Sequence, residues 1–384
     1  IVLTSMIGVG YLLLGTNVIA DEIKNLEKRL EYLIKKKELD QELNKIKVKL
    51  NKLQNEYSDV IKTSTIKPKV DKSEKISSAS KPKVDKSKKI SSASIKTLVD
   101  AIGPYKQDLS RLSNKNGKII SNKKLDLSRN SEIVDYYRIK YLSDELKIEG
   151  FVIIPKNKTG KIPAIIYNRG GNRSYGELTK RHLMWLSMFS RQGYVILASQ
   201  YREGGDSEGS DEFGGADVND VLNLLALTKS LPIVDGNRIG MLGFSRGGMM
   251  TYLAIKKGAD VKAAVVLGGV TDLVQWVEDR GSGIYDIVSE LTGGDDEAKW
   301  RERSVTSWPH KIKIPLLIMH GEDDQAVDVS QAEKLADKLE VLYKGLDAEF
   351  RFVKFEGGDH ALMRPHARRK NTMIQRWFDK HLGN

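Results

Sequence analysis

The chain has 384 residues, 40% of them hydrophobic, which suffices for one large domain with extra segments or for two small domains. It contains no cysteine, which excludes disulfides, thiolate metal sites and a cysteine nucleophile. The net charge is +12, but residues 1–95 carry 20 Lys and Arg against 12 Asp and Glu, whereas the remainder carries 43 against 39. The basic N-terminal part can bind anionic surfaces by charge alone. No zinc-knuckle spacing or aromatic-basic RNA signature favours a specific nucleic acid.

Residues 1–20 are uncharged and mostly apolar, and strongly charged sequence follows them at once. This length can span a bilayer. It equally fits the apolar region of a signal peptide, with Val18 and Ala20 as small residues before a cut ahead of Asp21. We therefore expect export, either secreted or membrane-anchored, with the remainder outside the cytoplasm; anchor and cleaved signal both stay open.

Two segments without a globular pattern come next. In residues 21–57 apolar side chains recur at alternating spacings of four and three, which predicts a coiled-coil-like helix for self-association or spacing. A single solvated amphipathic helix is the alternative. Residues 58–95 contain a 14-residue repeat, 67–80 and 81–94, in which only Glu74 and Lys88 differ. This Lys/Ser-rich sequence cannot bury a core, so we expect a disordered basic linker that contacts an anionic surface.

In residues 96–384 the distribution of apolar residues becomes typical of a globular domain. Alternating apolar positions in 132–155 predict an antiparallel hairpin. Apolar runs of strand length then alternate with helical patterns, and this predicts a doubly wound, mostly parallel α/β sheet with helices on both faces. The strands are expected at 162–168, 194–200, 238–244, 262–268, 315–321 and 349–355, and the helices near 176–191, 216–230, 247–257, 330–343 and 366–381.

One serine in this part is bracketed by glycines, in the stretch "RIGMLGFSRGGMM". Ser245 follows a predicted strand and precedes a predicted helix, with Gly243 and Gly247 where a sharp turn leaves no room for side chains. An acid and a histidine are then expected after later strands. Asp323 and Asp324 follow "PLLIMHG", and His360 follows the last strand. A hydroxyl needs a base to become a nucleophile, and that base needs a carboxylate to fix its tautomer.

Residues from about 133 to 382 resemble the catalytic domain of the prolyl oligopeptidase family, within the α/β-hydrolase superfamily. The resemblance is most specific in "DGNRIGMLGFSRGG", "RSVTSWPHKIKIPLLIMHGEDDQAV" and "GGDHAL". It implies an α/β-hydrolase fold and a catalytic triad of Ser245, Asp324 and His360, without metal or organic cofactor. Asp323 would be a solvated neighbour, and His320 a structural residue of the "HG" turn.

The resemblance also implies an oxyanion hole. The backbone N–H of Arg246, the residue after the nucleophile, is one expected donor. The second would come from the loop "NRGGNRSYG", where family members often carry a tyrosine before the two glycines and this chain has Arg169. We expect the backbone N–H of Arg169 or Gly170 to serve, while the Arg169 side chain binds an acidic group or faces solvent.

Two segments are expected around the substrate. The Gly-rich stretch 199–221, which includes Tyr201, should form the rim of the pocket, and its acids predict a solvated loop with a helix cap rather than a calcium site. Residues 270–313 form an insertion that should lie over the site as a cap. Its Trp276, Trp300 and Trp308 either line an apolar pocket or pack the cap onto the domain.

The sequence therefore predicts an extracytoplasmic serine hydrolase that acts on a small peptide or ester. Family resemblance slightly favours a peptidase that cleaves an amide bond through an acyl-enzyme. Residues 21–132 are too few for the β-propeller of the larger peptidases of the family, which keeps a carboxylesterase as an alternative. A surface-tethered, non-catalytic binding or scaffold protein is the third alternative.

Overall fold

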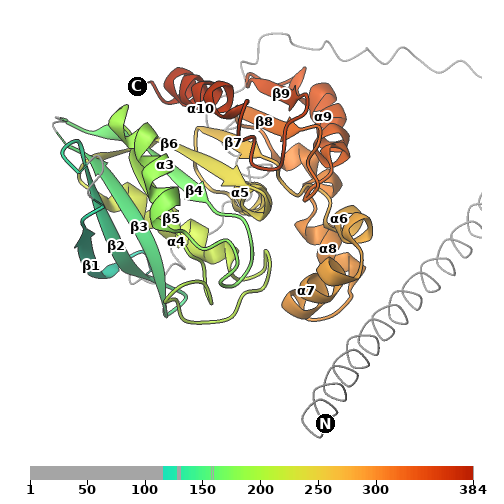
Figure 1. Ribbon diagram of the computed structural model, residues 1–384, viewed down its shortest axis with the longest axis horizontal. Helices are drawn as coiled ribbons and strands as arrows, with labels where there is room; N and C mark the ends of the chain where they lie inside the picture. Colours follow the sequence, from blue (N-terminus) through green and yellow to red (C-terminus); the bar gives the residue numbers. More distant parts are fainter. Residues whose placement is uncertain (1–115, 128–130, 157, 159, 384) are drawn as a thin grey trace, which may run out of the picture. The chain divides into compact units, whose positions relative to one another are not determined.

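The computed structural model describes residues 116–127, 131–156, 158 and 160–383. These residues build one nine-stranded sheet with the order β1-β2-β3-β5-β4-β6-β7-β8-β9 (Figure 1). The predicted segments 1–20, 21–57 and 58–95 lie outside the described residues. Within the described ones, no helix is both long and apolar enough to cross a lipid bilayer.

The strands divide into an antiparallel and a parallel part. β3 pairs antiparallel with both β2 and β5. The six strands β5, β4, β6, β7, β8 and β9, in their order across the sheet, run parallel to one another. The predicted hairpin and all six predicted apolar strands are confirmed; β1 was not predicted. The strands are β1 (Ile119–Leu125), β2 (Val134–Ser143), β3 (Leu146–Pro155), β4 (Ile162–Asn168), β5 (Val195–Ser199), β6 (Val234–Phe244), β7 (Ala263–Leu267), β8 (Leu316–Gly321) and β9 (Phe350–Phe355).

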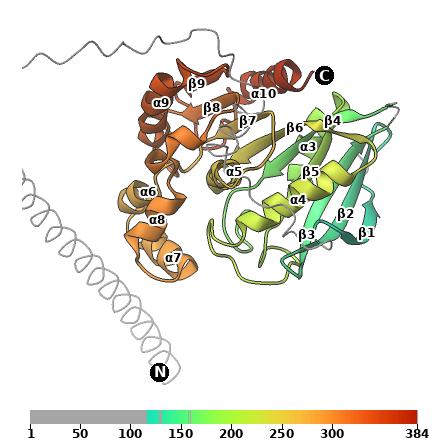
Figure 2. The ribbon, with the colours of Figure 1, turned by 180° about the vertical axis from the view of Figure 1, so that it is seen from behind.

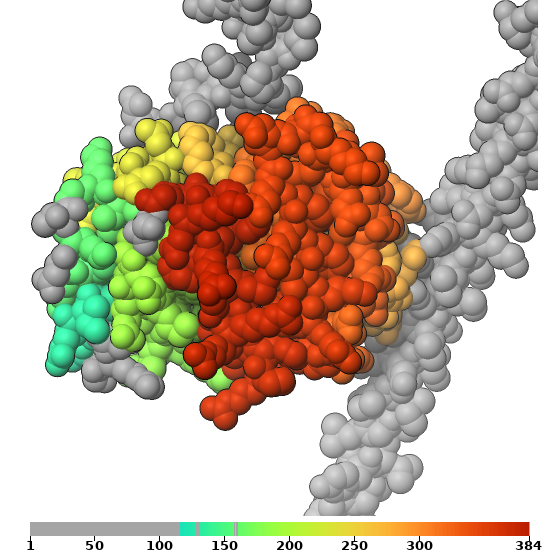
Figure 3. Space-filling model, turned by 90° about the horizontal axis from the view of Figure 1, so that it is seen from above, coloured from blue at the N-terminus to red at the C-terminus, as the bar shows by residue number. Residues whose placement is uncertain are grey.

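The central strands of the sheet are buried on both sides, because helices cover both of its faces (Figures 1 and 2). Seen from above, the dark red C-terminal residues lie at the surface beside the orange segments that precede them in the chain (Figure 3). On one face, α3 (Lys180–Arg191) and α10 (Ala367–Leu382) pack onto a core that includes Ile165 and Leu242. The other face is in contact with α4 (Val218–Ser230), α5 (Arg246–Lys256) and α9 (Val329–Tyr343). All five helices were predicted.

Residues 270–313 fold as a helical cap between β7 and β8. It contains α6 (Leu273–Arg280), α7 (Ser282–Thr292), α8 (Glu297–Arg303) and the 3₁₀ turns Val305–Ser307 and Pro309–Lys311. In Figure 1 the three α-helices lie together, below β8 and α9.

The tryptophans of the cap belong to its packing. Trp300 is fully buried, and its indole N–H donates to Thr292 Oγ1 at 2.9 Å. Trp308 is buried too, donates to the Glu302 carbonyl at 3.0 Å, and carries the Lys256 ammonium over its ring. Trp300 and Trp308 therefore pack the cap internally and onto the main domain, which is the second of the two alternatives.

The turn between β2 and β3 has only two residues, and both have left-handed backbones. The φ angle is 49° at Asp144 and 70° at Glu145. Two-residue hairpins require such angles, since they match the right-handed twist of the strands. Neither residue is the glycine or asparagine that adopts positive φ at low cost.

We predict that Glu145→Gly raises the free energy of unfolding by about 0.5–1 kcal/mol, because glycine removes the steric cost of the left-handed backbone. Urea denaturation measures the change. The matched control is Glu340→Gly on the exposed side of α9, which should lower stability by about 1 kcal/mol. A loss of stability at both positions would contradict the prediction.

Candidate active site

Ser245 occupies a strained turn between β6 and α5. Its backbone has φ 56° and ψ −125°, which L-residues rarely adopt. A Cβ added to Gly247 would lie 1.9 Å from the Asn168 carbonyl oxygen, and one added to Gly243 would lie 2.4 Å from the Gly247 carbonyl oxygen. Both positions therefore require glycine, and the G-x-S-x-G spacing has a steric explanation.

Asp324 follows β8 and has a fully buried carboxylate. Its Oδ1 accepts hydrogen bonds from the N–H groups of Ala326 and Val327, each at 2.9 Å, and its Oδ2 accepts one from His360 Nδ1 at 2.7 Å. Burial by itself raises the pKa of Asp324, but the hydrogen bonds from His320 and His360 outweigh it and hold the pKa well below its usual range. The carboxylate is thus kept ionised. Asp323 beside it is exposed, as predicted.

His320 makes a second imidazole contact with the same carboxylate. Its Nε2 lies 2.7 Å from the Val327 carbonyl oxygen and 3.1 Å from Asp324 Oδ2. Both partners are acceptors, so Nε2 carries the proton. The sequence indicated only a structural histidine in the turn after β8. Its contact with the acid was missed, although the spacing of four residues to Asp324 is a visible signal.

The sheet brings His360 next to the serine turn. The His360 ring lies 4.8 Å from that of Phe244, the residue before Ser245. Ser245 and His360 also both lie at the end of β7. The Ser245 N–H donates to the Leu267 carbonyl at 2.9 Å, and a Cβ added to Gly268 would lie 3.0 Å from His360 Nδ1. Among the described residues, the His360 imidazole makes its side-chain hydrogen bond to Asp324 and none to the Ser245 hydroxyl. The three predicted residues therefore gather at the carboxyl edge of the parallel strands.

The Arg169 side chain supports the loop after β4 from within. Arg169 is 1% exposed, and its guanidinium donates to four backbone carbonyls. The prediction that it binds an acidic group or faces solvent is therefore wrong. The acceptors are the carbonyls of Gly170 (3.0 Å), Arg173 (2.7 Å), Tyr175 (3.2 Å) and Gln200 (2.6 and 2.9 Å). Burial lowers the pKa of Arg169.

Two backbone N–H groups beside Ser245 are available as donors. Arg246 is the first residue of α5, so its N–H has no acceptor within the helix. A Cβ added to Gly170 would lie 2.9 Å from Ser245 Cβ, which puts this loop directly against the serine. In the described part of the chain, no backbone hydrogen bond uses the Gly170 N–H.

The Arg246 side chain is buried among acids and rings. It donates to both oxygens of Asp211, at 2.5 and 2.6 Å, and to Asp217. It also lies over the rings of Phe213 (4.6 Å) and Tyr201 (5.5 Å). Burial raises the pKa of Asp211, but the Arg246 charge outweighs this and holds it below its usual range.

The acidic stretch 199–221 is therefore only partly the solvated loop that was predicted. Asp206, Glu208 and Glu212 are exposed, but Asp211 and Asp217 are buried against Arg246. Asp220 is buried against Arg202 at 2.9 Å, and burial raises its pKa to about 6.

The two remaining pocket residues are also buried. Tyr201 has no exposed surface, and its hydroxyl donates to the Arg169 carbonyl at 3.3 Å, so it does not form a pocket rim. Trp276 is 8% exposed and stacks on Phe213 with ring centroids 6.0 Å apart. Its indole N–H donates to the Ala326 carbonyl at 2.7 Å and so holds the loop of Asp324. Both residues shape the loops around the site rather than a surface for substrate.

We predict that Arg246→Met lowers the free energy of unfolding by about 3–5 kcal/mol, because it leaves two buried carboxylates without their cation. Urea denaturation measures this. Arg246→Met combined with Asp211→Asn and Asp217→Asn should recover part of the loss. The control, Arg301→Met in the exposed pair with Glu297 on α8, should change little. Equal effects at positions 246 and 301 would contradict the role of the buried charges.

Comparison with known proteins gives the context of this site. A family model described as "Prolyl oligopeptidase family" matches residues 182–384, just over half of the chain. The chain is 33% identical over 223 residues to a Bacillus subtilis protein named "Uncharacterized peptidase YtmA". The match covers 56% of this chain and 84% of that relative.

Solved structures share the fold at lower identity. A puromycin-hydrolysing peptidase of Mycobacterium tuberculosis is 21% identical with a TM-score of 0.56, covering 62% of this chain and 37% of its own. Acetyl xylan esterase 1 of a Thermoanaerobacterium species is 18% identical with a TM-score of 0.50, covering 67% of this chain and 88% of its own. These two neighbours, a peptidase and an esterase, thus share one fold. The present chain matches well under half of the length of the solved peptidase.

Proposed function

Since this chain belongs to the prolyl oligopeptidase family, we propose that it is a serine peptidase in which Ser245 attacks the carbonyl carbon of a peptide bond. The observation that supports this most is the 2.7 Å hydrogen bond between buried Asp324 and His360, next to the strained turn of Ser245. Such a turn presents a serine hydroxyl above the sheet, where an oriented imidazole can remove its proton.

Each residue has a defined role in the proposed mechanism. His360 Nε2 takes the proton of the Ser245 hydroxyl as the oxygen bonds to the carbonyl carbon. Asp324 holds the imidazole with its proton on Nδ1 and stabilises the imidazolium that forms. The N–H groups of Arg246 and Gly170 donate to the oxyanion. His360 then gives the proton to the leaving amine nitrogen as the C–N bond breaks, and water hydrolyses the acyl-enzyme by the same steps.

The loop that carries Gly170 is joined to the cap. Arg173 on this loop donates to Glu290 of α7 at 2.7 Å and lies 3.4 Å from Glu203 on the acidic stretch. Three segments far apart in the sequence thus meet at Arg173, on the loop whose Gly170 lies against Ser245. We propose that a small peptide binds among them.

We further propose that this chemistry takes place outside the cytoplasm. The apolar segment 1–20 supports export, 21–57 would provide self-association, and the basic linker 58–95 would contact an anionic surface. The small residues Val18 and Ala20 fit a cleaved signal and the length of 20 residues fits an anchor, so the proposal covers both.

A carboxylesterase is the second candidate, because the same fold is found in acetyl xylan esterase 1. An ester and an amide pass through the same acyl-enzyme, so the triad and oxyanion donors fit both. The leaving group separates them: an amine needs protonation by His360, whereas an activated alcohol leaves without it.

The deciding assay compares the full chain with Ser245→Ala on aminoacyl and dipeptidyl p-nitroanilides and on p-nitrophenyl esters. We expect anilide cleavage, lowered about 10⁴-fold or more by the substitution, because loss of the nucleophile removes the chemistry. Ser210→Ala, at an exposed serine, is the matched control and should keep full activity. Serine-dependent cleavage of esters alone would favour the esterase. Turnover unaffected by Ser245→Ala would contradict both, and no serine-dependent turnover would leave the scaffold alternative.

Lys370 is a positioning residue for the same reaction. It is 5% exposed on α10, and its Nζ donates to the carbonyl of Ala361, next to His360, at 2.6 Å. Burial lowers the pKa of Lys370. The ammonium therefore ties the His360 loop to a helix packed on the core.

We predict that Lys370→Met lowers kcat about tenfold with little change in KM, since a displaced His360 loop affects proton transfer more than binding. Steady-state kinetics measure the split between kcat and KM. Lys370→Arg should recover part of kcat, and Lys344→Met, at an exposed lysine, should change neither constant. An unchanged kcat in Lys370→Met would show that the hydrogen bond does not position the base.

A further inference from the structure

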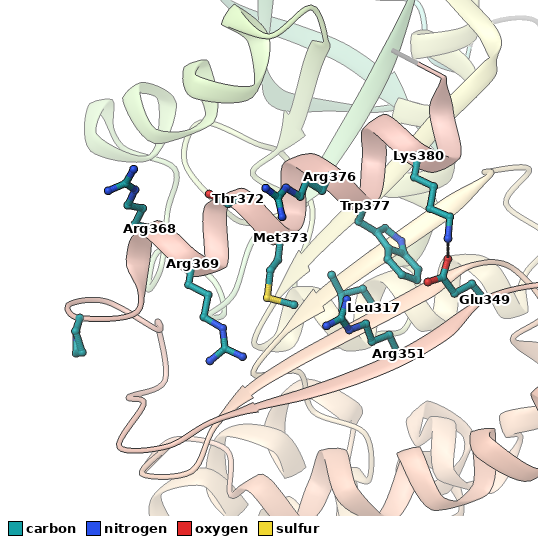
Figure 4. Close-up of a pocket in the computed structure, with 11 residues that line it drawn as sticks. Leu317, Glu349, Arg351, Arg368, Arg369, Thr372, Met373, Arg376, Trp377 and Lys380 are labelled. Atoms are coloured by element: carbon teal, nitrogen blue, oxygen red, sulfur yellow. Dashed lines mark hydrogen bonds and ion pairs between the residues drawn. The ribbon is translucent and has the colours of Figure 1, made fainter.

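A cavity of about 690 Å³ lies between α10 and the strands β8 and β9 (Figure 4). Neither Ser245, Asp324 nor His360 lines it. In Figure 4, Arg369, Met373 and Trp377 project from α10 toward the strands, where Leu317 and Arg351 lie. We call this cavity the cationic groove, after the five basic side chains that line it: Arg351, Arg368, Arg369, Arg376 and Lys380.

The positive charge of the groove is largely unneutralised. Lys380 pairs with Glu349 at 2.5 Å, and Arg369 lies over the Phe355 ring at 4.7 Å. Among the described residues, no ion pair involves Arg351, Arg368 or Arg376. α10 carries five Lys and Arg against one Asp, a surplus of four that equals the surplus of the whole chain from residue 96 onward. Four of these five basic residues, all except Lys370, line the groove, so α10 gives this cavity a positive potential.

The basic side chains are spread in a row along α10 rather than clustered at one position. Arg369, Arg376 and Lys380 follow one another at spacings of seven and four residues, which places them on one side of α10. From Arg368 to Lys380 the helix rises about 18 Å. Arg351 faces this row from β9. A ligand that uses the whole row must be extended and must carry repeated negative groups.

The polar groups of the groove are almost all donors. Guanidinium and ammonium groups only donate. The indole N–H of Trp377 also only donates; it is buried and has no hydrogen-bond partner among the described residues. The one carboxylate, Glu349, is used by Lys380 and lies 3.1 Å from His381. An acidic peptide would bring backbone N–H groups that find no acceptor here. Phosphate groups bring acceptors alone and match the fork of arginine.

We propose that the cationic groove binds a linear ligand with two or more phosphate groups. Arg369 and Arg376 on α10 and Arg351 on β9 supply bidentate donors, and Met373 and Leu317 supply the apolar floor between them. The lining residues come from a helix and from the strands beside it, so the occupant that we assign is a linear chain lying between them. This site is separate from the proposed peptidase chemistry and does not depend on it.

The test measures tripolyphosphate binding to the full chain by titration calorimetry at fixed salt. Arg369→Gln with Arg376→Gln should raise the Kd about tenfold or more, because two charge-assisted contacts are lost. The matched control is Arg181→Gln with Arg191→Gln, which removes the same charge from exposed positions on α3 and should stay within about twofold. Residues 1–95 are present in every protein, so their basic charge affects all of them equally.

Two further variants make the test specific. Arg369→Lys with Arg376→Lys keeps the charge but loses the fork and should bind with intermediate affinity. Arg351→Gln, at an exposed strand position, removes one donor and should raise the Kd about threefold even if the double variant fails to fold. Serine-dependent turnover should be unchanged in all of them, which separates failure of this proposal from failure of the peptidase proposal.

Three results would overturn the proposal. The first is tripolyphosphate binding that is equal in wild type and groove variants, and the second is no binding at all. The third is binding of hexaglutamate as tightly as tripolyphosphate with the same loss on Arg369→Gln and Arg376→Gln, which would assign the groove to acidic peptides.

Discussion

Two buried arginines contact the same aromatic ring, and the loops around Ser245 depend on them. The guanidinium groups of Arg169 and Arg246 lie 5.2 and 5.5 Å from the centre of the Tyr201 ring. Arg169 donates hydrogen bonds to backbone carbonyls of two loops, while Arg246 pairs with both Asp211 and Asp217. Buried charges of this kind are tolerated when they are paired and hydrogen-bonded. Every N–H of the Arg169 guanidinium group has a carbonyl acceptor nearby, and of the Arg246 side-chain nitrogens only Nε has no partner among the described residues. The two side chains therefore fix the backbone that presents the serine and its neighbouring N–H groups.

The parts of the fold that could be predicted are those with a local signal. Apolar runs between helical patterns indicated the parallel strands, and the glycines around Ser245 indicated the turn. The order of serine, acid and histidine placed Asp324 and His360 correctly at the ends of β8 and β9. β1 was missed because its sequence, IISNKKL, is mostly polar and exposed and lacks a clear alternation.

The parts that could not be predicted depend on contacts between distant segments. The acceptors of Arg169 lie on two loops, one of them formed more than 30 residues away, so nothing near position 169 indicates a buried guanidinium. Tyr201 and Trp300 have the composition of pocket residues, but only tertiary packing decides whether such a ring is exposed. The same holds for His320, whose contact with Asp324 follows from the turn after β8.

α10 connects the two sites that we propose. Through Lys370 it holds the loop of His360, and through Arg369 and Arg376 it forms one wall of the cationic groove. Lys370 and Arg369 are adjacent in sequence and project from neighbouring parts of one helix. The helix anchors a loop on one side and carries unpaired charge on the other. These two roles explain why α10 has one buried lysine among exposed arginines.

The central claim is that Ser245 is an activated nucleophile, and covalent labelling tests it most directly. The full chain would be treated with a fluorophosphonate, which loses fluoride when an activated serine oxygen bonds to its phosphorus. The labelled peptide would then be identified by mass spectrometry. We predict one adduct per chain, on Ser245, and none in Ser245→Ala. An adduct on a different serine, or an unlabelled chain, would contradict the claim.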